Sequence, residues 1–310
     1  MFQARDFIIT REGLVFAVTL NETEAGRVVA CLRYAPTPAG LRKVTTHEAE
    51  AILRTRYPRY LYYSPRRDAL LHAVPINAVE THLCPRQRLR ELLDRPATEP
   101  LIDKLQRLVD LFEVEGLSSE QLGVTGSLLI GLQHEASDLD LVVYGREPFE
   151  QARRIVRDGF AHGWLQAPDR ALWRATYQRR GCALSFDEYL WHEQRKYNKG
   201  AIDGTKFDLI LMEENSMDAD PRLWCKLGRT RIRAPVIDAE GAFATPARYR
   251  LDHPEIPLAL CFTATYLGQA EAGERVEISG HLEQASDGER RIVIGTSREA
   301  PEEYIKVIPS

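Results

Sequence analysis

The chain has 310 residues, of which 44% are hydrophobic and 28% are charged, and this composition is that of an ordinary globular protein. No apolar run approaches the length of a membrane span, and the first residues do not form a signal peptide, so we expect a cytoplasmic protein. The 5 cysteines lie far apart without a CxxC pair, which argues against a zinc site and against a disulfide framework. The net charge of -4 excludes a general attraction to nucleic acid and leaves only local basic patches for that role.

The N-terminal part is predicted to be rich in β-structure. β-Branched residues between turn residues predict a β-meander over residues 6–34, and Thr45 or Thr46 is expected to cap a helix after it. We assign residues 1–83 to this β-rich N-terminal domain.

A basic and aromatic stretch lies inside this domain. Residues 54–67 contain arginines interleaved with tyrosines and no acid, a pattern typical of a surface for phosphates and stacked bases. Its predicted nucleic-acid contacts are Arg54, Arg56 and Arg59. A solvated basic face whose tyrosines help to fill a small core explains the stretch slightly better.

Helices are predicted over residues 84–93 and 98–115, and the second has an apolar stripe that indicates packing. A β-type run at residues 122–125 then ends at Gly126 and Ser127. Glycine lets a phosphate approach the backbone closely, and a hydroxyl beside free N–H groups at a helix start favours an anion. Helix capping explains Ser127 equally well.

A pair of acids follows about ten residues later. Asp138-Leu139-Asp140 leads into an apolar strand, and because successive strand side chains point to opposite faces, Asp138 and Asp140 share one face. Adjacent carboxylates repel each other, and a divalent cation such as Mg²⁺ relieves that repulsion. A polar turn entering a buried strand is the alternative explanation.

A third acid lies on a later strand. Residues 206–212 form a strand-like run with Asp208 near its start, and Asp203 in the preceding turn is the alternative. A helix that begins at a Ser-x-x-Glu capping box at residue 185 runs toward this strand. It places Arg195, Lys196 and Lys199 where they are expected to bind a nucleotide, although cations near a helix C-terminus also complement its dipole.

Gly126-Ser127, Gly131, the run 137–141 and Asp208 together resemble the DNA polymerase β-like nucleotidyltransferase superfamily. The flanks at residues 33–36 and 276–283 look like an uncharacterised, largely archaeal group of predicted members. The resemblance implies an α+β fold whose nucleotidyltransferase core, a mixed sheet with helices, lies within residues 84–216. It also implies two Mg²⁺ or Mn²⁺ ions on Asp138, Asp140 and Asp208, and a nucleoside triphosphate such as ATP on Gly126 and Ser127.

Residues 217–310 are predicted to form a third domain. A basic stretch at residues 224–234 contains Arg229 and Arg231, which we predict to contact nucleic acid. Short strands with period-2 alternation, separated by turns, then predict a small C-terminal β-barrel of the Greek-key kind, with the oligonucleotide-binding (OB) type as one option.

The predicted reaction is transfer of a nucleoside monophosphate from a nucleoside triphosphate to a hydroxyl acceptor, with release of pyrophosphate. The basic stretch and the barrel favour a nucleic acid as acceptor, and RNA over DNA. One alternative is a catalytically silent nucleic-acid-binding or antitoxin-like protein with the same fold. Another is an enzyme that nucleotidylates a protein or a small molecule.

Overall fold

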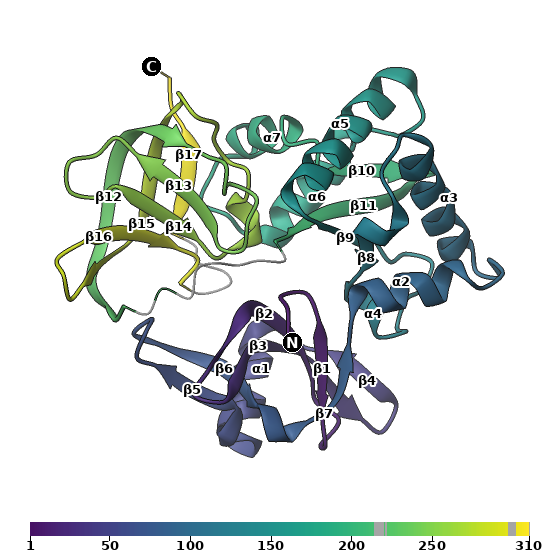
Figure 1. Ribbon diagram of the computed structural model, residues 1–310, viewed down its shortest axis with the longest axis horizontal. Coiled ribbons are helices and arrows are strands. Elements are labelled where there is room, and N and C mark those ends of the chain that lie inside the picture. The colour runs from purple at the N-terminus through teal and green to yellow at the C-terminus, as the bar shows by residue number, and fades with distance from the viewer. Residues whose placement is uncertain (214–219, 221, 297–301, 310) are drawn as a thin grey trace. The chain divides into compact units, whose positions relative to one another are not determined.

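The structure is a computed structural model that describes residues 1–213, 220, 222–296 and 302–309 (Figure 1). Helices and three β-sheets occur in the described residues, which confirms the predicted α+β class. Contacts divide the chain into two compact units. Unit 1 holds Met1–Pro65, Ala69–Ile155 and Ile202–Asp220, and unit 2 holds Arg66–Asp68, Val156–Ala201 and Pro221–Ser310. The predicted domain boundary after residue 83 stays a prediction, and the one after residue 216 lies outside the described residues.

The N-terminal part of unit 1 is a seven-stranded sheet with the order β5-β6-β3-β2-β1-β7 and with β4 on β3. Helix α1 (Thr46–Arg56) begins at a capping box formed by Thr45 and Glu48, and it buries Leu53 in a core that also contains Phe16 and Tyr60. The strands are β1 (Phe7–Thr10), β2 (Val15–Glu24), β3 (Arg27–Thr37), β4 (Gly40–Lys43), β5 (Leu61–Ser64), β6 (Ala69–Pro75) and β7 (Val79–Leu83), with short 3₁₀ turns at Pro58–Tyr60 and Ile76–Ala78.

A second sheet carries the acidic motif. Its order is β10-β11-β9-β8, and β9 pairs in parallel with β11 and antiparallel with β8. The strands are β8 (Leu122–Val124), β9 (Leu139–Tyr144), β10 (Lys199–Ile202) and β11 (Thr205–Met212). The helices before and between them are α2 (Pro85–Leu93), α3 (Pro100–Val114), α4 (Gly126–Leu129) and α5 (Arg146–His162), and a 3₁₀ turn at Ser119–Gln121 precedes β8. The predicted apolar stripe of α3 is buried from Leu101 to Phe112, as expected for packing.

Unit 2 contains α6 (Arg170–Arg180), α7 (Phe186–Gln194) and a six-stranded sheet with the order β12-β13-β14-β16-β15-β17. β12 also pairs with β15, so the pairings close into a ring, and β14 and β16 are parallel. The strands are β12 (Trp224–Asp238), β13 (Ala247–Leu251), β14 (Leu258–Cys261), β15 (Arg275–Ala285), β16 (Arg290–Ile294) and β17 (Tyr304–Val307), with a 3₁₀ turn at Ala264–Tyr266. The predicted barrel of the OB type stays a prediction. In the described part of the chain, no helix combines the length and the apolar character needed to cross a membrane.

Candidate active site

The structure brings the three predicted acids together at one end of the β9–β11 pair. Asp208 on β11 is the direct neighbour of Asp140 on β9, because the two strands pair in parallel with Phe207 beside Leu139. Asp138 lies immediately before β9 and shares a face with Asp140 through the alternation of strand side chains. Residues about 70 positions apart in the chain thus form one acidic cluster.

A buried lysine lies between two of these acids. The ammonium of Lys206 is 3.1 Å from Oδ2 of Asp138 and 3.0 Å from Oδ2 of Asp208, and its side chain is only 7% exposed. Burial alone lowers the pKa of Lys206, but the carboxylates of Asp208 and Asp138 outweigh burial, so its pKa is raised. Lys206 therefore remains charged and offsets part of the negative charge of the cluster.

The negative charge that Lys206 does not offset affects the pKa of Asp140. Burial, followed by the neighbouring charges of Asp208 and Asp138, raises the pKa of Asp140 to about 6 against the opposing effects of Lys206 and Arg5. Oδ1 of Asp208 is buried and has no hydrogen-bond partner within the described residues. A group of carboxylates with an unpartnered buried oxygen fits a hard divalent cation such as Mg²⁺, which prefers oxygen ligands.

The glycine of the Gly-Ser corner lies directly against the acids. Gly126 has a φ of +66°, and a Cβ atom built on it would lie 2.3 Å from Oδ2 of Asp140. Thr125 fixes this corner, because its N–H donates to the carbonyl oxygen of Asp140 at 2.9 Å and its hydroxyl donates to the carbonyl oxygen of Arg5 at 2.9 Å. Thr125, with no side-chain capping bond, occupies the N-cap position of α4, so Ser127 lies inside this helix and is not its cap.

Two site residues were not identified from the sequence. Arg5 has a φ of +76°, and its charge lowers the pKa of Asp140. No local pattern indicates Arg5, because its approach depends on the tertiary contact with Thr125. Lys206 did have a signal, since it lies two positions before Asp208 and therefore on the same face of the strand.

The cations predicted to bind a nucleotide belong to unit 2 and have carboxylate partners there. Arg195 donates through Nη1 and Nη2 to the two oxygens of Glu274, at 2.7 Å each. Lys196 lies 2.5 Å from Oε1 of Glu193, and Lys199 pairs with the other oxygen of the same carboxylate. All three side chains of this Glu193 cluster are buried. Nucleotide binding by Arg195, Lys196 and Lys199 stays a prediction.

The predicted nucleic-acid contacts differ in how freely they present their charge. Arg54 is exposed beside Glu50, and Arg56 lies over the ring of Tyr57 with 5.3 Å between the guanidinium carbon and the ring centroid. Arg59 pairs with Glu12 and lies over Tyr60, whose side chain is fully buried. Residues 54–67 contain no acid, but acids from other segments thus pair with some of their arginines.

The two arginines of β12 lie in unit 2. Arg229 pairs with Glu302, and Arg231 lies over the ring of Tyr304. These residues line an open hollow of about 490 Å³. Contact with nucleic acid by Arg229 and Arg231 stays a prediction, as it does for Arg54, Arg56 and Arg59.

Residues 104–218, which include all three acids, match the nucleotidyltransferase domain family. The chain is 33% identical over 334 residues to an uncharacterised protein of Methanocaldococcus jannaschii, and the match covers 98% of each chain. No solved structure matches the chain. The chain therefore belongs to the same family as this archaeal protein and carries a nucleotidyltransferase domain of the polymerase β-like superfamily, which confirms the predicted resemblance.

Proposed function

We propose that the protein is a metal-dependent nucleotidyltransferase that moves a nucleoside monophosphate from a nucleoside triphosphate to a hydroxyl acceptor. The observation that carries this proposal is the position of Asp208 beside Asp140 on parallel strands, with Asp138 sharing Lys206 with Asp208. A protein that only binds has no use for three clustered carboxylates, one of which has its pKa raised by burial and then by repulsion from the other two. A metal-dependent transfer reaction requires such a group.

Asp138, Asp140 and Asp208 would hold two Mg²⁺ or Mn²⁺ ions. The unpartnered Oδ1 of Asp208 and the exclusively oxygen-based donors fit hard cations of this kind. When bound, these ions neutralise the triphosphate and lower the pKa of the attacking hydroxyl. Because Lys206 already occupies Oδ2 of Asp138 and Asp208, its ammonium has to share or yield these oxygens.

In the proposed reaction the acceptor oxygen forms a bond to the α-phosphorus, the bond from that phosphorus to the bridging oxygen breaks, and pyrophosphate leaves. Asp208 helps to take the proton from the acceptor hydroxyl. Gly126 lets the carboxylate of Asp140 lie directly against the glycine corner, since any Cβ there would meet that carboxylate. A residue without a side chain also lets triphosphate oxygens approach the backbone closely. Ser127 is half-exposed on the same corner and offers a hydroxyl to the phosphates.

We further propose a nucleic acid, with RNA preferred, as the acceptor. Support comes from the exposed charge of Arg54 and Arg56 and of the β12 arginines Arg229 and Arg231. Five of the six strands in the sheet of unit 2 close into a ring in the order β12-β13-β14-β16-β15, and one of the pairs is parallel. This pairing agrees with a five-stranded Greek-key barrel of the OB type. This second support is an analogy between folds and carries less weight than the charges.

A protein or small-molecule acceptor is the second candidate, and a specific observation favours it. Tyr60 is fully buried and Arg59 is engaged by Glu12, so part of the basic and aromatic stretch is packing and cannot bind a base. Only the surrounding arginines remain available for phosphates. The silent binding protein is the third candidate, and the acidic cluster argues against it.

Label transfer tests these proposals together. The protein is incubated with α-labelled nucleoside triphosphates and Mg²⁺ or Mn²⁺, with RNA, DNA and cell protein as separate acceptors. Asp138→Ala is the test variant. Asp203→Ala is its matched control, because Asp203 is an exposed acid in the turn before β11 that pairs with Arg107 at 2.6 Å.

We expect label on RNA that disappears in Asp138→Ala and persists in Asp203→Ala. Label on protein instead would show that the acceptor is a protein, as in the second candidate function. Absence of transfer to any acceptor, combined with intact RNA binding, would overturn the enzyme proposal in favour of the silent binding protein.

A further inference from the structure

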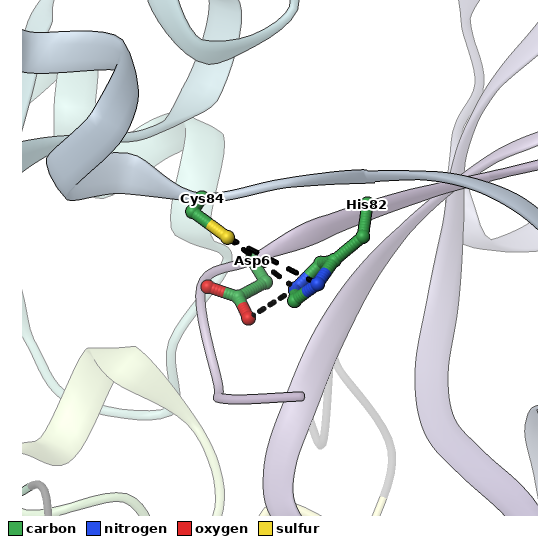
Figure 2. Close-up of side chains that lie close together, drawn as sticks. All are labelled: Asp6, His82 and Cys84. Atoms are coloured by element: carbon green, nitrogen blue, oxygen red, sulfur yellow. Dashed lines mark hydrogen bonds and ion pairs between the residues drawn. The ribbon is translucent and has the colours of Figure 1, made fainter. Parts of the chain in front are cut away.

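A second group of ligating side chains lies in unit 1, formed by residues outside the acidic cluster. Asp6, His82 and Cys84 point toward one another where β1 begins and where β7 passes into α2 (Figure 2). Each offers a different donor atom, and these atoms all lie within 4.8 Å of one another. The spacing of the cysteines in the sequence argued against a zinc site, because this group contains a single thiol, that of Cys84, and no CxxC pair.

The pairing of β1 with β7 explains why these side chains meet. The strands are antiparallel with Phe7 opposite Leu83 and Ile8 opposite His82. Asp6 and Cys84 each lie one residue beyond the Phe7–Leu83 pair, so they face each other and project to the same side of the sheet. His82, two positions before Cys84, projects to that side as well. The convergence is thus set by the backbone and does not depend on one flexible side chain.

The distances suit a tetrahedral ion. Oδ2 of Asp6 is 2.6 Å from Nε2 of His82, and Sγ of Cys84 is 3.7 Å from the same nitrogen. Ordinary zinc bond lengths in tetrahedral geometry place an oxygen and a nitrogen ligand about 3.4 Å apart, and a nitrogen and a sulfur ligand about 3.6 Å apart. The His–Cys spacing already fits, and the Asp–His pair needs a movement of less than about 1 Å.

The group is partly accessible from outside. The side chain of Asp6 is only 4% exposed, whereas that of His82 is 27% exposed and Cys84 is half-buried, so the group is open on one side. Both bonds to the Asp6 carboxylate, from the N–H of Gln3 at 2.8 Å and from His82, end on Oδ2.

A thiol nucleophile activated by histidine does not fit this geometry. Such a mechanism needs the thiol on one ring nitrogen and the carboxylate on the other. Here Asp6 and Cys84 both approach Nε2 of His82 most closely. Donors that converge on one point, in contrast, are the arrangement that a metal ion requires.

We propose that Asp6, His82 and Cys84 form a binding site for a divalent transition metal of the Zn²⁺ type. Imidazole nitrogen and thiolate sulfur select such an ion over Mg²⁺, which the acidic cluster fits instead. The ion ties the start of β1 to the start of α2. It also steadies Arg5, the neighbour of Asp6, whose carbonyl oxygen holds Thr125 beside Gly126.

Cobalt binding tests this site without reference to catalysis. The full chain is stripped with a chelator, kept reduced and titrated with Co²⁺, whose bond to a thiolate gives a charge-transfer band in the near ultraviolet. The test variants are Cys84→Ser and His82→Gln, and their matched controls are Cys225→Ser and His47→Gln, at an exposed cysteine and an exposed histidine. The acidic cluster contains no sulfur, so the band separates the two sites whether or not nucleotidyl transfer is found.

We expect the band to saturate at one Co²⁺ per chain in the wild type and in both controls, and to vanish in Cys84→Ser. Metal affinity should fall at least tenfold in His82→Gln, since even groups that only orient a ligand contribute about 10- to 100-fold. Zn²⁺ should raise the midpoint of thermal unfolding more in the wild type than in Cys84→Ser, which keeps the Asp6–His82 pair and is therefore expected to fold. A band that persists in Cys84→Ser, or Co²⁺ binding without any thiolate band, would overturn the proposal and leave an ordinary ion pair beside a thiol.

Discussion

Gly126 and Asp140 are in such close contact that no side chain fits between them, since a Cβ on Gly126 would lie 2.3 Å from Oδ2 of Asp140. In Gly126→Ala this carboxylate, a proposed metal ligand, has to move, and the methyl group hinders the approach of phosphate oxygens to the backbone. We expect nucleotidyl transfer to fall by roughly 100-fold, because small displacements of a positioned group cost about that much. The matched control is Gly26→Ala, at a φ of +70° against +66° but with nothing within 4 Å. If nucleotidyl transfer fell equally in both variants, backbone strain alone would explain the loss.

Asp140 serves the proposed activity but lowers the stability of the folded protein. Its pKa of about 6 means that the folded protein disfavours the charged carboxylate, owing first to burial and then to the nearby acids. Asp140→Asn should abolish transfer and raise the free energy of unfolding in a chelator by roughly 1–2 kcal/mol. Chemical denaturation with and without chelator measures this change. A loss of stability in Asp140→Asn would show that the acid is a structural residue.

Lys206, in contrast to Asp140, stabilises the folded protein. Removal of one partner from a buried ion pair costs about 3–5 kcal/mol, because the other charge remains buried without compensation. Lys206→Met should therefore be strongly destabilised in a chelator and should recover stability as Mg²⁺ is added. Its matched control is Lys104→Met, at a half-buried lysine that bonds to Asp203 and Thr205. Thermal unfolding at increasing Mg²⁺ concentration distinguishes the two, and a Lys206→Met variant insensitive to Mg²⁺ would contradict the cation site.

His192 gives unit 2 a dependence on pH. Its Nδ1–H donates to the carbonyl oxygen of Glu188 at 2.7 Å, and Nε2 accepts from the N–H of Val307 at 3.0 Å, so the second bond needs the neutral ring. Burial, and then the charges of Lys196 and Arg195, lower its pKa to about 4 from an ordinary value of 6.5. The unfolded chain therefore binds more protons than the folded one between these values, so stability is complete above pH 6.5 and is lost as the pH falls toward 4.

The expected loss is on the order of 3 kcal/mol, from about 1.4 kcal/mol per pKa unit. Urea denaturation between pH 7 and pH 4 measures it. His192→Gln should be less stable at pH 7 and should lose less stability on acidification than the wild type. His47→Gln, at an exposed helix position, should follow the wild type. Parallel curves for His192→Gln and the wild type would rule His192 out as the source.

The sequence predicted those parts of the site that depend on local pattern. Alternation along a strand placed Asp138 and Asp140 on one face, and the third acid was found on the expected strand. The register that sets Asp208 beside Asp140 depends on pairing between distant segments and has no local signal. Arg5 was not predicted for the same reason, because its contact depends on distant segments. The contact of Asp6 with His82 was not predicted either, since these residues lie 76 positions apart. The helix predicted to carry the cations ends earlier than expected, because α7 stops at Gln194 and Lys199 already belongs to β10. Local pattern also did not indicate which acids these cations contact, as the Glu193 cluster shows.

The route of the chain between the two acidic strands has a consequence for the order of assembly. After Ile155 the chain leaves unit 1, and it returns only at Ile202, so Asp140 and Asp208 remain apart until this long excursion is complete. Closing so long a connection makes their parallel pairing slow, since nonlocal contacts form late in folding. The strand that completes the acidic cluster also carries Lys206. During synthesis the third negative charge thus arrives together with the positive charge that makes its burial tolerable.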